Sequence, residues 1–365
     1  MADKLRVGII GASPNIGWAS RSHIPGFATG KLNAELVAVS TTRQESADEA
    51  AQKFGAAHAF DDHRKMLELD DLDVVAVVVK LPHHYQLTKD AIEAGKHVYT
   101  EWPLGTTTAQ AEELATLAKE KGVRTAVGLQ ARRSAEFLHI RKLIDEGYLS
   151  DVLSCTMVQI SGGSLSRPEG RIWMRDAAQG ANTLSISFGH AIDGLFTMVG
   201  GMATVAGSVN TQVPEWAADE TGEKFSVDAP DDILTTGTLR SGGSVSTHVA
   251  AVARQGSGYR FEVRGTEGTL RLLGPGSVHA GPGQVFGAQG DAKELEAIEV
   301  PQDQWVVDEG LKGGAINIGK LWASFADSIA NGTTQFDPDF DAAVEHHRFI
   351  DAVQRASDTG QTQTL

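Results

Sequence analysis

The stretch Arg6-Val7-Gly8-Ile9-Ile10-Gly11-Ala12-Ser13-Pro14-Asn15-Ile16-Gly17 decides the fold of this chain of 365 residues. A glycine-rich turn between a strand and a helix points backbone N–H groups at a pyrophosphate. The usual fingerprint has glycine at its first, third and sixth positions. Here Gly11 fits, Ser13 takes the second place and Gly17 comes one residue late, so a turn without a ligand is the alternative. We expect dinucleotide contacts from Gly11, Ser13, Asn15 and Ile16.

The first 130 residues alternate between short apolar runs and helical patterns. Strands are expected at Arg6–Ile10, Ala34–Ser40, Val74–Val79, His97–Thr100 and Arg124–Leu129, and helices at Glu45–Phe54, Tyr85–Ala94 and Ala109–Glu120. Such alternation with short connections predicts a parallel sheet with helices on both faces. Residues 1–130 are therefore expected to form an α/β domain, a doubly wound Rossmann sheet.

From residue 131 onward strands dominate the pattern. After a helix at Ala135–Asp145, strands are expected at Val152–Ile160, Thr204–Val209, Leu234–Arg240, Ser244–Ala251, Tyr259–Arg264 and Thr269–Leu272. Gly274–Gly290 reads as an exposed loop, and Ile316–Ala330 and Asp341–Ser357 as late helices. We expect residues 131–365 to form a substrate-binding and dimerisation domain of the α+β type, with a large open and mostly antiparallel sheet.

Composition restricts the possible partners. With 47 acidic and 32 basic residues, the net charge of −15 argues against direct binding of nucleic acid or an anionic membrane. The single cysteine, Cys155, fits a packing role in a reducing compartment. No signal peptide is expected, because Lys4-Leu5-Arg6 leads directly into a strand. A cytoplasmic protein is the resulting expectation.

The end of the second strand bears on the choice of dinucleotide. An Asp or Glu there bonds the ribose hydroxyls of NAD, but this chain has Ser40-Thr41-Thr42-Arg43. A hydroxyl and a guanidinium suit a 2′-phosphate better, so Thr41 and Arg43 favour NADP over NAD. A solvated loop charge is the alternative for Arg43.

Five motifs in order resemble the Gfo/Idh/MocA family of sugar and polyol dehydrogenases. They are Arg21–Pro25, Ala94–Val98, Glu101-Trp102-Pro103-Leu104, Gly189-His190-Ala191-Ile192-Asp193 and Arg264–Gly268. The resemblance covers nearly the whole chain. It implies a Rossmann domain, a second domain whose open sheet forms a dimer interface, and NAD(P)-dependent oxidation of a sugar or polyol hydroxyl or reduction of the ketone.

The resemblance also implies the site residues. Ligands bind at the carboxyl edge of a parallel sheet, so we expect cofactor contacts there from Leu81, Pro82, His84, Glu101, Trp102 and Gln130. His190 matches the family's acid/base histidine, and Asp193 follows one turn later. Trp102 replaces the lysine of the family's Glu-Lys-Pro motif, and Ile186 stands where an aspartate is common. Arg171, Trp173 and Arg175 are candidates for substrate contacts.

The roles of the candidate catalytic side chains leave alternatives open. His190 alone can serve as the base if it titrates near the working pH. An indole cannot take a proton, so Trp102 either shapes the pocket, by stacking on a sugar or walling the nicotinamide, or is a packing residue. A core histidine is the alternative for His190. His346-His347 are most simply surface or packing residues, and no catalytic metal is expected.

The favoured interpretation is an enzyme acting on a carbohydrate-like small molecule, as a homodimer or a dimer of dimers. The Glu-Trp turn and Ser187-Phe188-Gly189-His190 resemble a narrower group, the fungal galactose/lactose-metabolism regulatory proteins. That resemblance implies the alternative, a non-catalytic NAD(P)-binding sensor that docks on a regulatory protein partner.

Overall fold

The computed structural model describes residues 4–15, 17–277, 283–333 and 336–365, which divide into two compact units. The first unit comprises Met1–Arg133 with Asp303–His347, and the second comprises Ser134–Gln302 with Arg348–Leu365. This division differs from the single boundary near residue 130 that the sequence predicts. The difference arises because the segment from Asp303 carries an apolar helix that packs on the first sheet.

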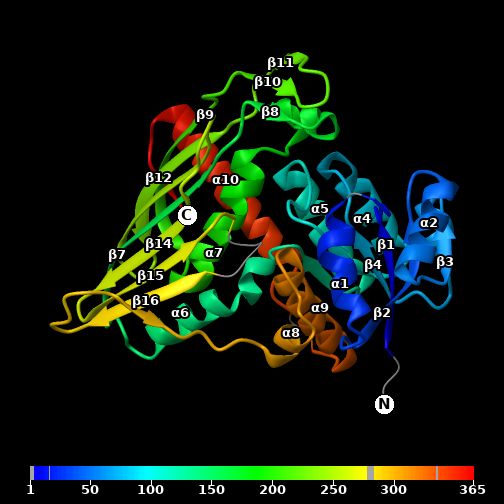
Figure 1. Cartoon of the computed structure of the whole chain (residues 1–365), viewed down its shortest axis with the longest axis horizontal. Coiled ribbons are helices and arrows are strands. Elements are labelled where there is room, and N and C mark those ends of the chain that lie inside the picture. The colour runs from blue at the N-terminus through cyan, green and yellow to red at the C-terminus, as the bar shows by residue number, and fades with distance from the viewer. Residues whose placement is uncertain (1–3, 16, 278–282, 334–335) are drawn as a thin grey trace. The chain divides into compact units, whose positions relative to one another are not determined.

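The first unit contains a six-stranded parallel sheet in the order β3-β2-β1-β4-β5-β6 (Figure 1). Its strands are β1 (Leu5–Ile10), β2 (Ala34–Ser40), β3 (His58–Phe60), β4 (Val74–Val77), β5 (His97–Thr100) and β6 (Thr125–Val127). The connecting helices are α1 (Ile24–Ala28), α2 (Gln44–Phe54), α3 (His63–Leu67), α4 (His84–Glu93) and α5 (Thr108–Lys121). The expected doubly wound sheet is confirmed. The strand order reverses between β1 and β4, where sheets of this kind bind ligands.

Burial explains the composition of the central strand β4. All four of its residues are fully buried, as expected for a parallel strand covered on both faces.

The helix that follows β5, α5, begins and ends at typical caps. The Thr107 hydroxyl accepts the N–H of Gln110, and Gly122 ends α5 with a left-handed φ of 65°.

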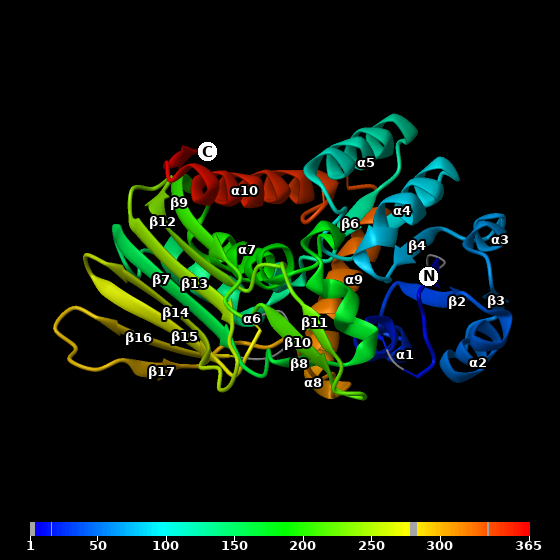
Figure 2. The same ribbon diagram turned by 90° about the horizontal axis from the view of Figure 1, so that it is seen from above.

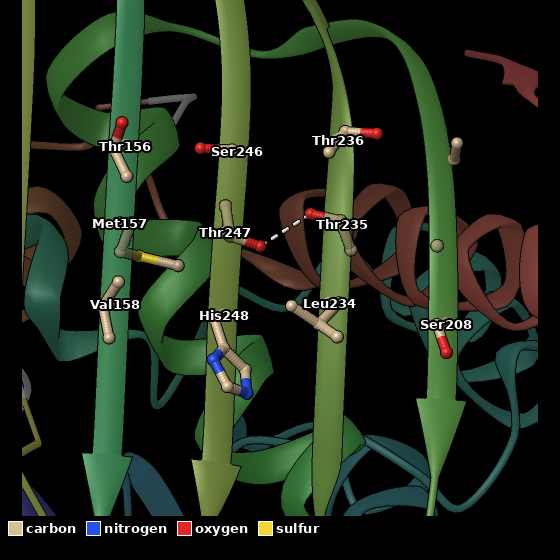
Figure 3. Close-up of a pocket in the computed structure, with 12 residues that line it drawn as sticks. Thr156, Met157, Val158, Ser208, Leu234, Thr235, Thr236, Ser246, Thr247 and His248 are labelled. Atoms are coloured by element: carbon tan, nitrogen blue, oxygen red, sulfur yellow. Dashed lines mark hydrogen bonds between the residues drawn. The ribbon is translucent and has the colours of Figure 1, made fainter.

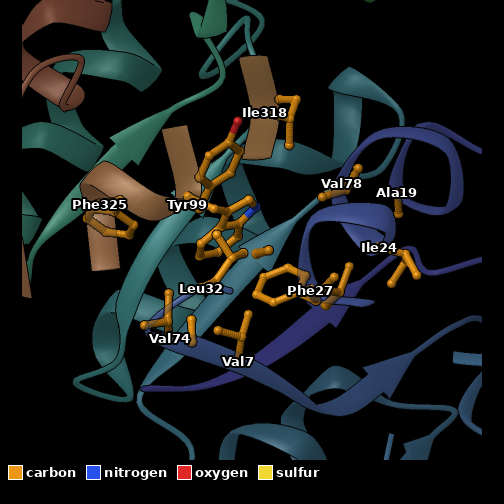
Figure 4. Packing of buried hydrophobic residues seen from close by; sticks show 14 of the residues in the cluster. Val7, Ala19, Ile24, Phe27, Leu32, Val74, Val78, Tyr99, Ile318 and Phe325 are labelled. Atoms are coloured by element: carbon orange, nitrogen blue, oxygen red, sulfur yellow. The ribbon is translucent and has the colours of Figure 1, made fainter. Parts of the chain in front are cut away.

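Helix α9 (Gly314–Ala330) completes the core of the first unit. Its buried residues Ile318, Leu321, Trp322 and Phe325 recur at helical spacing and therefore form one apolar face. The Trp322 ring stacks on Tyr99 of β5, with 4.9 Å between ring centroids, and meets the edge of Phe27 at 5.0 Å. Figure 4 shows Ile318 and Phe325 among the side chains of this cluster. The short helix α8 (Gln304–Asp308) precedes α9.

The second unit is built on a nine-stranded sheet in the order β17-β16-β15-β14-β7-β13-β12-β9-β18. Among its described strand pairs only β7 and β13 are parallel, which confirms an open and mostly antiparallel sheet. The strands are β7 (Val152–Ser161), β9 (Met202–Asn210), β12 (Asp232–Leu239), β13 (Ser244–Ala251), β14 (Gly258–Gly265), β15 (Gly268–Gly274), β16 (Gln284–Gln289), β17 (Glu296–Ile298) and β18 (Gln363–Thr364).

The expectation of a loop over Gly274–Gly290 is wrong for the part that forms β16. A side chain at Gly287 would place its Cβ 2.5 Å from the Tyr148 hydroxyl and 2.6 Å from Ile298. The glycine therefore allows close packing inside a strand rather than marking a flexible turn. Residues 278–282 of this segment lie outside the described residues.

Helices cover one face of the nine-stranded sheet (Figure 2). They are α6 (Ala135–Asp145), α7 (Gly189–Val199) and the part of α10 (Phe340–Thr359) from residue 348 onward. The opposite face carries no helix of this unit within the described residues, and we call it the outer face. A separate small sheet joins β8 (Ser166–Arg167), β10 (Glu215–Ala218) and β11 (Lys224–Ser226). In the described part of the chain no helix is long and apolar enough to cross a membrane.

We expect Trp322→Ala to lower the free energy of unfolding of the first unit by about 3–5 kcal/mol, because it removes a buried indole and leaves a cavity. Urea unfolding followed by circular dichroism measures the loss. Val307→Ala on α8 is the control; its side chain is 55% exposed, and we expect a change within about 0.5 kcal/mol. Equal effects of the two substitutions would contradict this assignment of the core.

Candidate functional site

The turn after β1 requires glycine at position 11. Gly11 has a φ of 93°, and a Cβ there would lie 2.2 Å from the carbonyl oxygen of Val78. Its N–H donates to Ser40 at 2.8 Å, so the turn is tied to β2. By contrast, among the described residues a Cβ on Gly17 would approach Ser13 alone, at 3.9 Å. The space beside Gly17 is therefore open with respect to these residues, as a pyrophosphate site needs.

The other expected residues of this turn differ in their surroundings. Ser13 is half-buried and donates its N–H to the Gly11 carbonyl at 2.9 Å, whereas Asn15 is exposed. Ile16 lies outside the described residues. The carbonyl of Pro14 accepts a hydrogen bond from the Lys53 ammonium on α2 at 2.6 Å, which places a positive charge beside the turn.

Hydroxyl groups define the end of β2. The Thr41 hydroxyl lies 2.6 Å from that of Ser46, and each is 2.9 Å from the Arg43 carbonyl oxygen. Thr41 therefore holds the shape of the turn. The Arg43 side chain is exposed at the start of α2, with no carboxylate among residues 40–43.

A buried hydrogen-bond chain fixes Glu101. The Trp322 indole N–H donates to His23 Nδ1 at 3.0 Å, and His23 Nε2 lies 2.8 Å from Glu101 Oε1. Because Nδ1 accepts this hydrogen bond, it carries no proton, so the ring proton of His23 resides on Nε2 and is donated to the carboxylate. Sequence reasoning missed His23 and Trp322 as partners of Glu101, although His23 lies in one of the five motifs.

Trp102 packs against two imidazoles. Its indole is only 4% exposed, and its centroid lies 4.8 Å from that of His346 and 4.7 Å from that of His347. Both histidines belong to the first turns of α10 and are buried. These ring contacts are compatible with both roles left open for Trp102, pocket wall and packing residue. Burial, together with His346, lowers the pKa of His347 to about 3.

His84 joins the two loops at the carboxyl edge of β4 and β5. Its Nδ1 lies 2.7 Å from the Pro103 carbonyl oxygen and its Nε2 3.1 Å from that of Val79. Burial lowers the pKa of His84 although both carbonyls favour the charged ring. Leu81 beside it is buried, and Pro82 is exposed. His84 therefore positions the Glu101–Pro103 turn.

Gln130 offers an unused amide at the same edge. It follows β6 and is fully buried, yet neither its Oε1 nor its Nε2 has a hydrogen-bond partner among the described residues. Burying an amide without partners is costly, so a polar group that completes its bonding is expected. Next to it, a Cβ on Gly128 would lie 2.8 Å from Glu101 Oε2. The ends of β5 and β6 thus bring Glu101 and Gln130 to one edge, and the open turn and this amide fit a dinucleotide.

The candidate acid/base pair lies in the second unit. His190 and Asp193 are on α7, with 4% and 0% exposure, and their spacing of three places them on one helix face. An Asn182–Ser185 capping box opens the π-helical segment Thr183–Phe188 before α7. Ile186 in that segment is half-buried and supplies no carboxylate.

The segment with the expected substrate contacts forms a short 3₁₀ helix, Glu169–Arg175. Arg175 stacks over Phe225 at 5.5 Å and donates to the Ser226 carbonyl at 3.0 Å. Arg171 is exposed and Trp173 half-buried. Arg175 therefore contacts β11 and stabilises the small sheet of β8, β10 and β11.

Comparison with known families identifies the class of protein. Residues 5–129 match the Gfo/Idh/MocA oxidoreductase family with its NAD-binding Rossmann fold, and residues 136–274 match the Gal80p C-terminal domain. The first domain is thus similar to the NAD-binding Rossmann domain of that oxidoreductase family, and the second domain is similar to the C-terminal domain of Gal80p.

Both dehydrogenases and regulators are among its relatives. The dehydrogenase aclE of Aspergillus oryzae is 26% identical and aligns over 99% of this chain and 98% of its own. The galactose/lactose metabolism regulatory protein GAL80 of Kluyveromyces lactis is also 26% identical, over 74% of this chain and 64% of its own. A solved levoglucosan dehydrogenase in complex with NADH shares the fold, with a TM-score of 0.84, 23% identity and 99% coverage of each chain.

The pKa of His347 predicts acid sensitivity. Its folded pKa of about 3 lies below the unfolded value of ~6.5. Above pH ~6.5 the neutral ring therefore does not lower the free energy of unfolding. As the pH drops toward 3, that free energy falls by ~1.4 kcal/mol per pH unit. We expect His347→Gln to reduce the acid slope of the unfolding free energy by that amount, as measured by urea unfolding between pH 4 and 7. An unchanged slope would contradict the assignment.

Proposed function

We propose that the protein is an NAD(P)-dependent oxidoreductase that acts on a hydroxyl or ketone of a sugar, polyol or related polyhydroxy compound. The observation that carries the proposal is the buried amide of Gln130, which lacks a partner at the edge where such sheets bind cofactors. The name of levoglucosan dehydrogenase, which matches over the whole chain, supports the substrate class.

Several residues would hold the dinucleotide. The turn after β1, open beside Gly17, suits the pyrophosphate, Gln130 has an amide to offer, and the exposed Arg43 suits a 2′-phosphate. When bound, the nicotinamide supplies the hydride chemistry. Glu101 is held by His23 and cannot swing freely, so it gives that edge a fixed negative charge.

His190 is the proposed acid/base. In the oxidation direction its neutral imidazole takes the hydroxyl proton of the substrate, and in the reduction direction the imidazolium returns it. Asp193, one turn later on the same helix face, is proposed to orient the ring and to stabilise its charged form. Trp102 is proposed to shape the pocket without moving a proton, since an indole has only an N–H donor.

A second candidate function is a non-catalytic NAD(P)-binding sensor that docks on a partner protein. The packing of Trp102 against His346 and His347 favours it, because no ammonium replaces the lost lysine at that position. The similarity to GAL80 over 74% of the chain agrees with this candidate. The two candidates share dinucleotide binding and differ only in turnover.

Self-association is proposed for both candidates, as a homodimer or a dimer of dimers. The outer face has a shallow hollow of about 410 Å³ over β7, β13, β12 and β9 (Figure 3). Small side chains line it, including Ala206, Ser208, Thr236 and Ser246, and would allow the flat face of a second copy to approach closely.

Catalysis is tested at 340 nm, with purified protein, both cofactors and a panel of sugars, polyols and keto-sugars. We expect turnover, and a loss of about 10²–10⁴-fold in kcat for His190→Ala with cofactor binding retained, because a positioned base contributes that factor. His58→Ala, at the exposed start of β3, is the control and should keep activity. Tight cofactor binding without turnover on the whole panel would leave the sensor as the function.

Cofactor choice is tested separately by calorimetric titration. We expect Arg43→Ala to weaken NADP(H) binding by about tenfold or more, because it removes a charge-assisted bond to the 2′-phosphate, and to leave NAD(H) binding nearly unchanged. Arg64→Ala, with a side chain 66% exposed on α3, should alter neither. Equal losses for the two cofactors would overturn the role of Arg43, and absence of binding of either would sink both candidate functions.

A further inference from the structure

A cluster of arginines surrounds one carboxylate on the outer face of the nine-stranded sheet. Glu262 of β14 is only 3% exposed in its side chain, yet three guanidiniums reach it. Arg260 Nη2 donates to Oε2 at 3.0 Å, Arg271 Nε donates to the same oxygen at 2.5 Å, and Arg264 contacts Oε1. The carboxylate therefore holds three cations together.

Sheet geometry explains why these side chains meet. Arg260, Glu262 and Arg264 alternate along β14 and therefore point to one face, and Glu262 pairs directly with Arg271 of β15. Across the other edge of β14, Glu262 pairs with Thr156 of β7. The cluster thus sits on rigid central strands, beside threonine hydroxyls at neighbouring paired positions, rather than on a loop.

The charges of the cluster do not balance. Three guanidiniums and one carboxylate leave two positive charges, in a chain whose net charge is −15. The other residues with the same orientation on β7, β14 and β15 are uncharged: Ser154, Thr156, Val158, Ile160, Gly258, Thr269 and Leu273. Like charges held this close repel, so an added anion would stabilise the arrangement.

The guanidiniums also keep donors to offer. Their side chains are 56%, 49% and 32% exposed for Arg260, Arg264 and Arg271, so the cluster is reachable from solvent. A guanidinium has five N–H donors in a planar fork, and among the described residues the ion pairs of these three guanidiniums are with Glu262 alone. Planar forks of this kind match phosphate oxygens in pairs.

We propose that Arg260, Arg264 and Arg271, organised by the buried Glu262, form a binding site for a tetrahedral oxyanion of the phosphate class. The site lies on the same outer face as the hollow proposed for self-association, but on β14 and β15 with none of its four residues in the lining of that hollow, and it does not depend on the proposed oxidoreductase function. Its ligand is either free phosphate or the phosphate group of a small organic phosphomonoester, since both present the same oxygens to the arginines.

The test is calorimetric titration of the full chain, without dinucleotide, with inorganic phosphate, sulfate and a hexose phosphate at constant ionic strength set by sodium chloride. We expect saturable binding of one phosphate per chain that Arg264→Gln and Arg271→Gln each weaken by about tenfold or more. Arg141→Gln is the matched control, because Arg141 also pairs with a carboxylate in this unit and is 46% exposed. Tighter binding of the hexose phosphate than of phosphate would identify the phosphomonoester as the source.

A second variant separates binding from structural support. Glu262→Gln removes the only counter-charge, so we expect a lower melting temperature that phosphate restores and sodium chloride of equal ionic strength does not. No saturable phosphate binding to the unmodified chain, or binding that survives Arg264→Gln and Arg271→Gln, would overturn the proposal; survival would assign the phosphate to another site, such as the Gly11 turn. Loss of the dimer in both arginine variants, without phosphate binding, would assign the cluster to a second copy of the chain.

Discussion

The hydrogen bond from the Trp322 indole to His23 is the contact on which the candidate cofactor edge depends. It makes Nδ1 of His23 an acceptor, so the proton of the neutral ring faces Glu101. Glu101 in turn lies against Gly128, the residue that leads from β6 to Gln130. A helix from the far end of the sequence therefore sets the protonation and position of groups on strands β5 and β6. Replacing the indole would remove the hydrogen bond that fixes the tautomer of His23.

The second constraint is the loss of an ammonium after Glu101. Trp102 occupies its place and is packed against two imidazoles of α10, while His84 bonds the carbonyl of the proline that follows. This turn is consequently built for packing and positioning. In the proposed enzyme, proton transfer falls to His190 in the other unit, and the first unit supplies the binding of the dinucleotide. This separation also explains how one fold can serve as either an enzyme or a sensor.

Local patterns in the sequence predict the two sheets well. The spacing of apolar residues and the residues that form turns both depend only on neighbours in the sequence. The apolar run Val74–Val79 predicts a strand, which the structure has at Val74–Val77, and Gly11 fits a turn where the structure requires glycine. What the sequence could not show is which distant residues meet. His23 and Trp322 are 299 positions apart, and nothing local to either marks the pair. The glycines near β16 predict a loop where the structure has a strand, for the same reason. The Tyr148 hydroxyl, which leaves no room for a side chain at Gly287, lies far from it along the chain.

The discontinuous make-up of the first unit has a consequence for its biosynthesis. The ribosome delivers Met1–Arg133 first, but the α9 residues that cover the sheet, among them Trp322 and Phe325, emerge only after residues 134–302. At about 5–20 residues per second, that interval lasts roughly ten to thirty seconds. During it the nascent sheet displays the apolar side chains of Phe27 and Tyr99 without their cover. The order of synthesis thus leaves this unit incomplete until late in translation, and a stop after residue 133 would release a domain without the part of its core that α9 supplies.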